Sequence, residues 1–205
     1  VLGDVERFNA VKNVVFCPHP LYDNFGEKVS REEALRFLHL DPDMRYMLFF
    51  GIIRDYKGLD LLLQAMGDER IKRTKVKLII AGEFYNNGEQ YHELEKSLGL
   101  ENQLVWHSEF VPDSEVKYYF NACDIVVQPY KSATQSGVTQ IAYHFEKPML
   151  VTDVGGLKEI VPDGVVGYVT AVDPAQIADA LVDFFANGRK ETFERNIQVE
   201  KQKTS

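Results

Sequence analysis

Six short apolar segments alternate with segments of helical periodicity along most of this chain, and the alternation restricts the fold more than any other feature. Nearly continuous apolar runs that end at Gly or Pro are typical of parallel strands buried on both faces. We therefore predict strands at residues 46–50, 76–81, 104–107, 124–128, 148–152 and 168–170. The predicted helices between and after them span residues 58–66, 89–98, 113–123, 136–145, 156–161 and 175–186.

Parallel strands joined by helices need right-handed crossovers, which place helices on both faces of the sheet. The predicted fold class is therefore α/β, a doubly wound Rossmann-like parallel sheet of about six strands, with strand order 3-2-1-4-5-6. Ligands bind such sheets outside the carboxyl ends of the strands, where the order reverses. In this chain that crevice would lie between the first and fourth strands.

Helix start signals support the two ends of this arrangement. Ser30 and Glu33 form a capping-box pattern before a helix expected to reach Leu40. Asp173, Pro174 and Gln176 provide a cap, a first-turn proline and a capping-box partner for the last helix of the sheet.

Composition excludes several classes of protein. The 205 residues include 23 basic and 31 acidic side chains, a net charge of −8, which argues against nucleic-acid or membrane-surface binding driven by bulk charge. No stretch approaches the roughly 20 apolar residues of a membrane span, and no signal peptide is visible. Cys17 and Cys123 lie far apart and form no CxxC, so we expect a reducing, cytoplasmic setting.

Familiar catalytic motifs are absent from the sequence. It contains neither GxGxxG nor GxxxxGK[ST], which argues against a dinucleotide-dependent dehydrogenase or a P-loop ATPase. It also lacks HExxH and GxSxG, and its five histidines are scattered, so no metal site is expected. The DPD sequence at residues 41–43 precedes a strand, and we interpret it as a loop.

Positive charge and a helix start meet at the predicted crevice. The loop after the first strand carries Arg54 and Lys57. The loop after the fourth strand leads into a helix that begins near Ser136 and Gly137. Free N–H groups and the positive end of the helix dipole favour an anion there, and glycine lets the anion approach the backbone. These features predict a diphosphate site, although ion pairing of the two cations with Asp55 and Asp60 would be a purely structural alternative.

Four segments resemble one known family. They are FFGIIRDYKGLDLLLQAM at residues 49–66, KLIIAGE at 77–83, HSEFVPDSEVKYYFNACDIVVQPY at 107–130 and EKPMLVTDVGGLKEIVPDGVVGYVT at 146–170. In this order they resemble the C-terminal, donor-binding domain of GT-B glycosyltransferases, specifically glycosyltransferase family 4, the group 1 glycosyltransferases. The resemblance covers residues 18–186.

The resemblance implies a nucleotide-sugar site and a role for each part of the crevice. Arg54 and Lys57 would act catalytically by binding the donor diphosphate. The start of the helix after the fourth strand would contact the phosphates through Ser136, Gly137 and Val138. Candidates for contact with the base are Gly82, Glu83, Glu109, Phe110 and Val111.

The chain departs from the family pattern at the sugar-binding positions. Family members usually carry two glutamates eight positions apart, where this chain has Ala133 and Ile141. The SATQSGV sequence at residues 132–138 resembles a subfamily variant of that loop. Candidates for donor sugar or ribose binding are then Gln135, Thr139 and Gln140, which would otherwise be polar residues of a helix surface.

The resemblance thus implies the donor-binding domain of a glycosyltransferase that transfers a sugar from a UDP- or GDP-linked donor, with retention and without a cofactor or metal. The expected domains are a linker at 1–20 from a missing N-terminal domain, the donor domain at 21–189 and a truncated C-terminal helix at 190–205. The missing domain would hold a saccharide or lipid-linked acceptor, as in polysaccharide biosynthesis, so the chain alone would not catalyse transfer. Alternatives are a non-catalytic nucleotide-sugar binding module, a GT-B-like epimerase or phosphorylase, and a flavodoxin-like or receiver domain.

Overall fold

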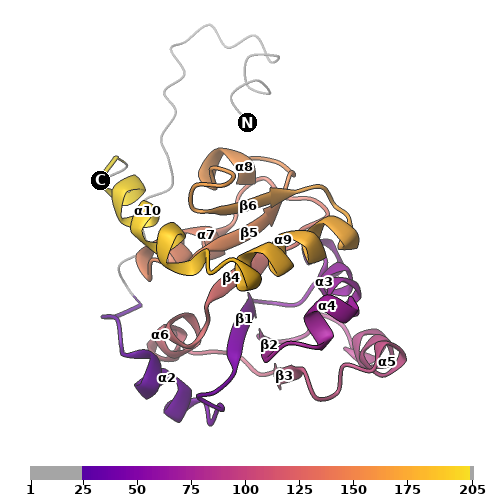
Figure 1. The fold of residues 1–205 in the computed structure, drawn as a ribbon. Helices are drawn as coiled ribbons and strands as arrows, with labels where there is room; N and C mark the ends of the chain where they lie inside the picture. The colour runs from indigo at the N-terminus through magenta and orange to yellow at the C-terminus, as the bar shows by residue number, and fades with distance from the viewer. Residues whose placement is uncertain (1–24, 204–205) are drawn as a thin grey trace, which may run out of the picture.

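A computed structural model describes residues 25–203 and shows one six-stranded parallel sheet (Figure 1). The strand order is β3-β2-β1-β4-β5-β6, so the predicted class and order are confirmed. Each predicted strand lies within one residue of the observed bounds. The strands are β1 Arg45–Phe50, β2 Val76–Ala81, β3 Leu104–His107, β4 Ile125–Gln128, β5 Met149–Thr152 and β6 Gly167–Thr170.

The central strand β1 explains why the apolar runs are continuous. Its residues pair with β2 along the whole strand, and Met47 and Leu48 pair with Ile125 and Val126 of β4. Leu48 belongs to the core on one face of the sheet and Met47 to the core on the other. Because helices cover both faces, neither set of alternating positions faces solvent. The apolar run is therefore continuous and lacks the alternating polar residues of a half-exposed strand.

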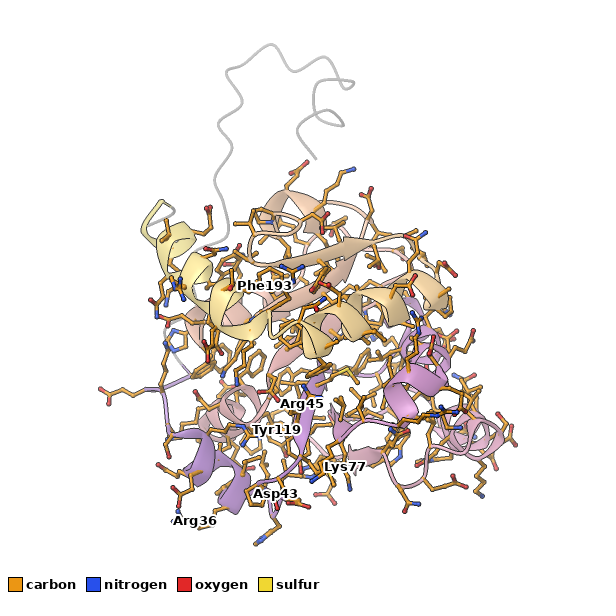
Figure 2. All side chains as sticks on the ribbon, in the orientation of Figure 1. Arg36, Asp43, Arg45, Lys77, Tyr119 and Phe193 are labelled. Carbon is orange, nitrogen blue, oxygen red and sulfur yellow. The ribbon has the colours of Figure 1, made fainter. Side chains whose placement is uncertain are left out.

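Helices divide between the two faces (Figure 1). One face packs against α2 Arg31–Phe37, α6 Asp113–Ala122, α7 Gly137–His144 and α8 Leu157–Ile160. The other face packs against α3 Leu59–Met66, α4 Glu69–Lys72, α5 Glu89–Leu98 and α9 Pro174–Ala186. The last helix, α10 Lys190–Lys203, contributes Phe193 to one core and Ile197 to the other (Figure 2).

Several helix ends differ from the sequence predictions. Ser30 caps α2 as expected, since its Oγ accepts from the Glu33 N–H at 3.1 Å. The helix nevertheless ends at Phe37, because His39 adopts a left-handed conformation with φ 53° and Leu40 N–H returns to the Leu35 carbonyl. Gln176 does not complete a capping box: its Oε1 accepts from Ala171 N–H instead.

Two short elements were not predicted, namely α4 and a 3-10 helix at Asp55–Lys57. Each is too short for a hydrophobic period to be visible in sequence. Residues 41–43 form a loop, as interpreted, in which Asp43 N–H donates to the Asp41 side chain. Cys123 is buried, whereas Cys17 and the predicted linker lie outside the described residues. No helix within residues 25–203 has the length and apolarity needed to cross a membrane.

Candidate functional site

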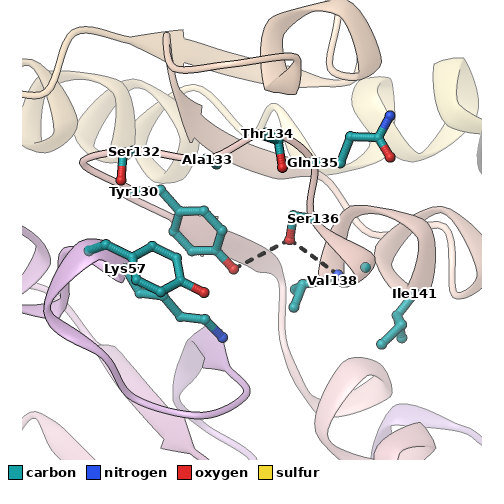
Figure 3. Close-up of a pocket in the computed structure, with 11 residues that line it drawn as sticks. Lys57, Tyr130, Ser132, Ala133, Thr134, Gln135, Ser136, Val138 and Ile141 are labelled. Carbon is teal, nitrogen blue, oxygen red and sulfur yellow. Dashed lines mark hydrogen bonds between the residues drawn. The ribbon is translucent and has the colours of Figure 1, made fainter. Parts of the chain in front are cut away.

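A cavity of about 660 Å³ opens between the loops that follow β1 and β4, at the point where the strand order reverses (Figure 3). We call it the switch-point cavity. Sequence reasoning predicted a crevice at this place. Its lining consists of Tyr56, Lys57, Tyr130, Ser132, Ala133, Thr134, Gln135, Ser136, Gly137, Val138 and Ile141.

The two loops are held directly against each other. Gly58, which precedes α3, has φ +69°, and a Cβ built on it would lie 1.9 Å from the Pro129 carbonyl oxygen. A larger residue would therefore force the loops apart. The Lys131 N–H donates to the Tyr56 carbonyl at 2.7 Å, which joins the same loops a second time.

Among the described residues, Lys57 is the one charged residue of the cavity lining. Its Nζ makes no hydrogen bond or ion pair with any residue from 25 to 203 and lies 5.8 Å from the centre of the Tyr130 ring. A Cβ at Gly51 would lie 2.9 Å from this Nζ, so glycine provides its space. Burial, and next the charge of Arg54, lower the pKa of Lys57 to about 8.

The acidic residues of this loop and of the first turn of α3 have other partners. Asp60 accepts from Lys131 Nζ at 2.8 Å. Asp55 accepts from Gln90 Nε2 at 3.1 Å and from the Tyr91 hydroxyl at 3.4 Å. The structural alternative, in which Asp55 and Asp60 pair with Arg54 and Lys57, is therefore wrong.

Helix α7 begins at the opposite wall, where Ser136 is the N-cap (Figure 3). Its Oγ accepts from the Val138 N–H at 3.2 Å and donates to Gln128 Oε1 at 2.7 Å. The Tyr130 hydroxyl lies 3.3 Å from the same Oγ. The first N–H groups of a helix have no partner within the helix, so this end offers donors and a partial positive charge to the cavity.

Arg54 does not line the cavity. Its guanidinium lies over the ring of Tyr85, 4.2 Å from the ring centre, and Tyr85 is 64% exposed. The structure therefore separates the two cations that the sequence placed together: Lys57 faces the cavity, and Arg54 stacks on an aromatic ring beyond its lining.

The sugar and ribose candidates also separate. Gln135 lines the cavity. Thr139 is fully buried, and its hydroxyl donates to the Ser136 carbonyl at 2.5 Å. Gln140 is buried as well and is absent from the lining. Ala133 and Ile141, at the positions of the usual glutamates, both line the cavity, and no lining residue in the described part of the chain carries a carboxylate.

The base candidates lie at the same edge of the sheet but outside the cavity lining. Gly82 and Glu83 follow β2, and Gly82 has φ +138°; a Cβ built on it would lie 2.4 Å from the Gly51 carbonyl oxygen. Glu109, Phe110 and Val111 follow β3, and the Phe110 side chain is 69% exposed.

Sequence reasoning missed Tyr56, Gln128 and Tyr130. Tyr56 and Tyr130 line the cavity, and their rings meet edge to face with centres 6.1 Å apart. Burial raises the pKa of Tyr130 to about 12, so its hydroxyl keeps its proton near neutrality. Gln128 and Tyr130 stand at the end of the fourth predicted strand, and this position at the switch point was the available signal. Among the described residues, no three His, Cys, Asp or Glu side chains gather as a metal site would require.

Solved structures of similar fold include sucrose-phosphate synthase from Thermosynechococcus elongatus, with a TM-score of 0.81, 18% identity and coverage of 98% of this chain and 52% of that one. Anabaena HepE in complex with UDP and glucose gives a TM-score of 0.72 at 21% identity, covering 89% of this chain and 51% of that one. The C-terminal domain of a Francisella tularensis glycosyl transferase group 1 protein gives 0.73 at 21% identity, with coverage of 86% and 94%.

The relatives found by sequence are glycosyltransferases, in agreement with the solved structures of similar fold. A D-inositol 3-phosphate glycosyltransferase of Frankia alni is 33% identical over 153 residues, which cover 70% of this chain and 37% of the relative. One of Corynebacterium diphtheriae is 30% identical over 162 residues, 76% of this chain and 38% of the relative. The chain thus spans less than half the length of these curated relatives. The family model for glycosyl transferases group 1 matches residues 44–187, which include the whole sheet and the switch-point cavity. The chain therefore belongs to the glycosyl transferases group 1 family.

Proposed function

We propose that this chain is the donor-binding part of a longer glycosyltransferase, which transfers a sugar from a nucleotide sugar to an acceptor with retention. The observation that carries the proposal is Lys57, a cation without a carboxylate partner among residues 25–203, facing the capped start of α7 across the switch-point cavity. Two sources of positive potential around a space of about 660 Å³ suit a nucleoside diphosphate.

The chemistry follows from this charge pattern. Transfer breaks the bond between the anomeric carbon and the donor phosphate oxygen, so negative charge grows on the departing diphosphate. Lys57 and the Gly137 N–H would stabilise that charge, while Ser136 and Val138 would hold the helix start in place. Donors already fixed before reaction stabilise the transition state more than the ground state. Arg54 would approach the diphosphate from the outer side, and no step requires a metal ion or cofactor.

The remaining parts of the donor have candidate positions. Gln135 is the candidate for sugar or ribose hydroxyls, because it lines the cavity and carries both a donor and an acceptor. The base would lie toward Gly82, Glu83 and residues 109–111, at the ends of β2 and β3. Similarity to HepE in complex with UDP and glucose makes a UDP-linked donor the first to test, and GDP the second. The acceptor, a saccharide or a lipid-linked saccharide, would bind a part of the enzyme outside this chain.

A non-catalytic nucleotide-sugar binding module is the second candidate. It is favoured by Ala133 and Ile141, which line the cavity where the resemblance predicts carboxylates. Sugar transfer by the full-length protein would exclude this module, whereas tight donor binding without turnover would establish it.

A thermal-shift panel with UDP, GDP, ADP and their sugar conjugates tests the proposed function. A ligand at 100 times its dissociation constant adds about 2.7 kcal/mol to the free energy of unfolding. That should raise the melting temperature of a chain of this size by roughly 2 °C or more. We expect a shift with one nucleotide series, undiminished by EDTA. If neither this chain nor the full-length protein shifts with any nucleotide, the proposal is wrong.

A further inference from the structure

Gln128 is buried directly behind the switch-point cavity. It is the last residue of β4 and is 1% exposed, and it does not line the cavity. Its Oε1 accepts from Ser136 Oγ at 2.7 Å. Its Nε2 is buried and has no hydrogen-bond partner among the described residues.

The bond to Gln128 sets the direction of the other bonds at Ser136. A serine hydroxyl has one proton and two lone pairs. The proton goes to Gln128 Oε1, so the two lone pairs must accept from Val138 N–H and from the Tyr130 hydroxyl, which lie 3.2 and 3.3 Å away. The chain of donors therefore runs from Tyr130 to Ser136 to Gln128.

This direction decides what the cavity offers to a ligand. The Ser136 hydroxyl has no remaining proton or lone pair for a ligand, and the Val138 N–H is engaged. The Tyr130 hydroxyl donates its hydrogen bond to Ser136, so its oxygen can only accept from a ligand. This suits a ligand hydroxyl rather than a phosphate oxygen. At the start of α7 the Gly137 N–H remains to donate to a phosphate, and Lys57 lies across the cavity from it.

The unpartnered Nε2 indicates that stability alone does not explain a glutamine at position 128. A buried N–H without a partner is unfavourable to folding. Methionine has nearly the volume of glutamine and would remove that group together with the acceptor of the Ser136 hydroxyl, so the gain from the first offsets the loss of the second in the free energy of unfolding.

We propose that Gln128 is a positioning residue of the donor site, which fixes the Ser136 hydroxyl and through it the start of α7. The proposal rests on the proposed function, because its effect on a ligand is read as affinity for a nucleoside diphosphate. A merely structural role would lower stability on substitution and leave ligand affinity per folded molecule unchanged.

The test is the Gln128→Met variant of this chain, titrated with UDP and with inorganic pyrophosphate as a probe that lacks the base. We expect an unchanged or higher melting temperature and an affinity about 3- to 10-fold weaker, the usual effect of losing one hydrogen bond. The matched control is Gln103→Met, because the Gln103 side chain is also hydrogen-bonded, in this case by donation to the Lys72 carbonyl, and lies at the opposite end of the sheet. Unchanged affinity in Gln128→Met would overturn the proposal.

A double-mutant cycle tests whether Gln128 acts through Ser136. If it does, Gln128→Met combined with Ser136→Ala should bind no more than about twofold more weakly than the weaker single variant. Effects that multiply would mean independent roles and would contradict the proposal.

Hydrogen exchange of the Val138 amide gives a readout that needs no nucleotide. We expect faster exchange in Gln128→Met than in the parent chain and in Gln103→Met, because the cap that protects this amide is loosened. Failure of both the parent chain and the full-length protein to bind any diphosphate would count against the proposed function. Unchanged Val138 exchange would count against the positioning role itself.

Discussion

The two ends of the sheet hold positive charge in opposite ways. At the amino end, Lys190 of α10 pairs with the buried Asp124, and Lys147 lies 3.9 Å from Glu194. At the carboxyl end, Lys57 and Arg54 have no carboxylate partner among the described residues.

Burial alone does not distinguish the two ends. Burial lowers the pKa of Lys147 as it lowers that of Lys57. What differs is the neighbouring carboxylate, which is present at the amino end and absent from the cavity wall as far as residues 25–203 form it. Removing a buried lysine that has a carboxylate partner leaves that carboxylate uncompensated, whereas a lysine without such a partner is available for an anionic ligand.

The largest expected effect is on turnover. Lys57→Ala in the full-length enzyme should lower turnover about 10²- to 10³-fold, because it removes a donor aimed at the departing diphosphate. Steady-state kinetics with saturating donor would measure it. Near-normal turnover would remove Lys57 from the mechanism and leave the comparison of the two ends without a functional meaning.

For the free energy of unfolding we expect the opposite ranking, with a larger loss from removing Lys190 at the amino end than from removing Lys57 at the carboxyl end. Lys190→Met leaves the carboxylate of Asp124 buried with the Tyr46 N–H as its remaining partner, so we expect a loss of about 1–3 kcal/mol in the free energy of unfolding. Lys57→Met removes a desolvated charge and should leave that free energy unchanged or raise it. Urea denaturation of both variants would measure the difference. A larger loss in Lys57→Met would show that Lys57 is structural.

Donor affinity should fall as pH rises. The unbound Lys57 has a pKa of about 8, so it is charged at pH 7 and loses its proton above pH 8. Binding of an anion favours the charged form, and affinity should therefore decrease by up to about tenfold per pH unit above 8. Calorimetric titration of UDP from pH 7 to 9.5 would show it, with Lys57→Arg as the control that stays charged and gives a flat profile. An equally flat profile in the parent chain would contradict the assigned role.

Arg54 should matter less than Lys57. Its guanidinium stacks on exposed Tyr85 and lies outside the cavity lining, so we expect Arg54→Ala to weaken donor affinity about 3- to 10-fold. Tyr85→Ala should have a smaller effect, because a cation–π contact at an exposed site contributes little. A loss from Arg54→Ala as large as that from Lys57→Ala would mean that Arg54 turns into the cavity when the donor binds.

The sequence was sufficient to predict the sheet and the crevice, because apolar runs and glycine turns act locally and the topology then follows from crossover handedness. It could not predict which way each side chain in the crevice turns. Arg54 and Lys57 are three positions apart in one loop, yet a 3-10 turn at Asp55–Lys57 sends them in different directions. Thr139 was a ligand candidate but bonds to the Ser136 carbonyl one turn back, as threonine hydroxyls in helices often do.

Long-range contacts could not be predicted from the sequence either. The hydrogen bond from Ser136 to Gln128 joins the start of a helix to the end of a strand, and no periodicity in the sequence indicates such a contact. The weakly amphipathic segment after residue 190 forms one helix because Phe193 and Ile197 reach two different cores. Such a helix depends on tertiary packing rather than on its own period.

The central claim is that Lys57 carries an unpaired charge that receives a diphosphate, and an NMR titration of its side-chain nitrogen tests this most directly. Lysine labelled with ¹⁵N, assigned with Lys57→Arg, would be titrated from pH 6 to 11 with and without UDP. We predict a pKa near 8 in the free chain, rising by about one unit or more in the complex because the diphosphate favours the charged amine. An ordinary lysine pKa in the free chain, or a pKa that UDP leaves unchanged while it binds, would contradict the account.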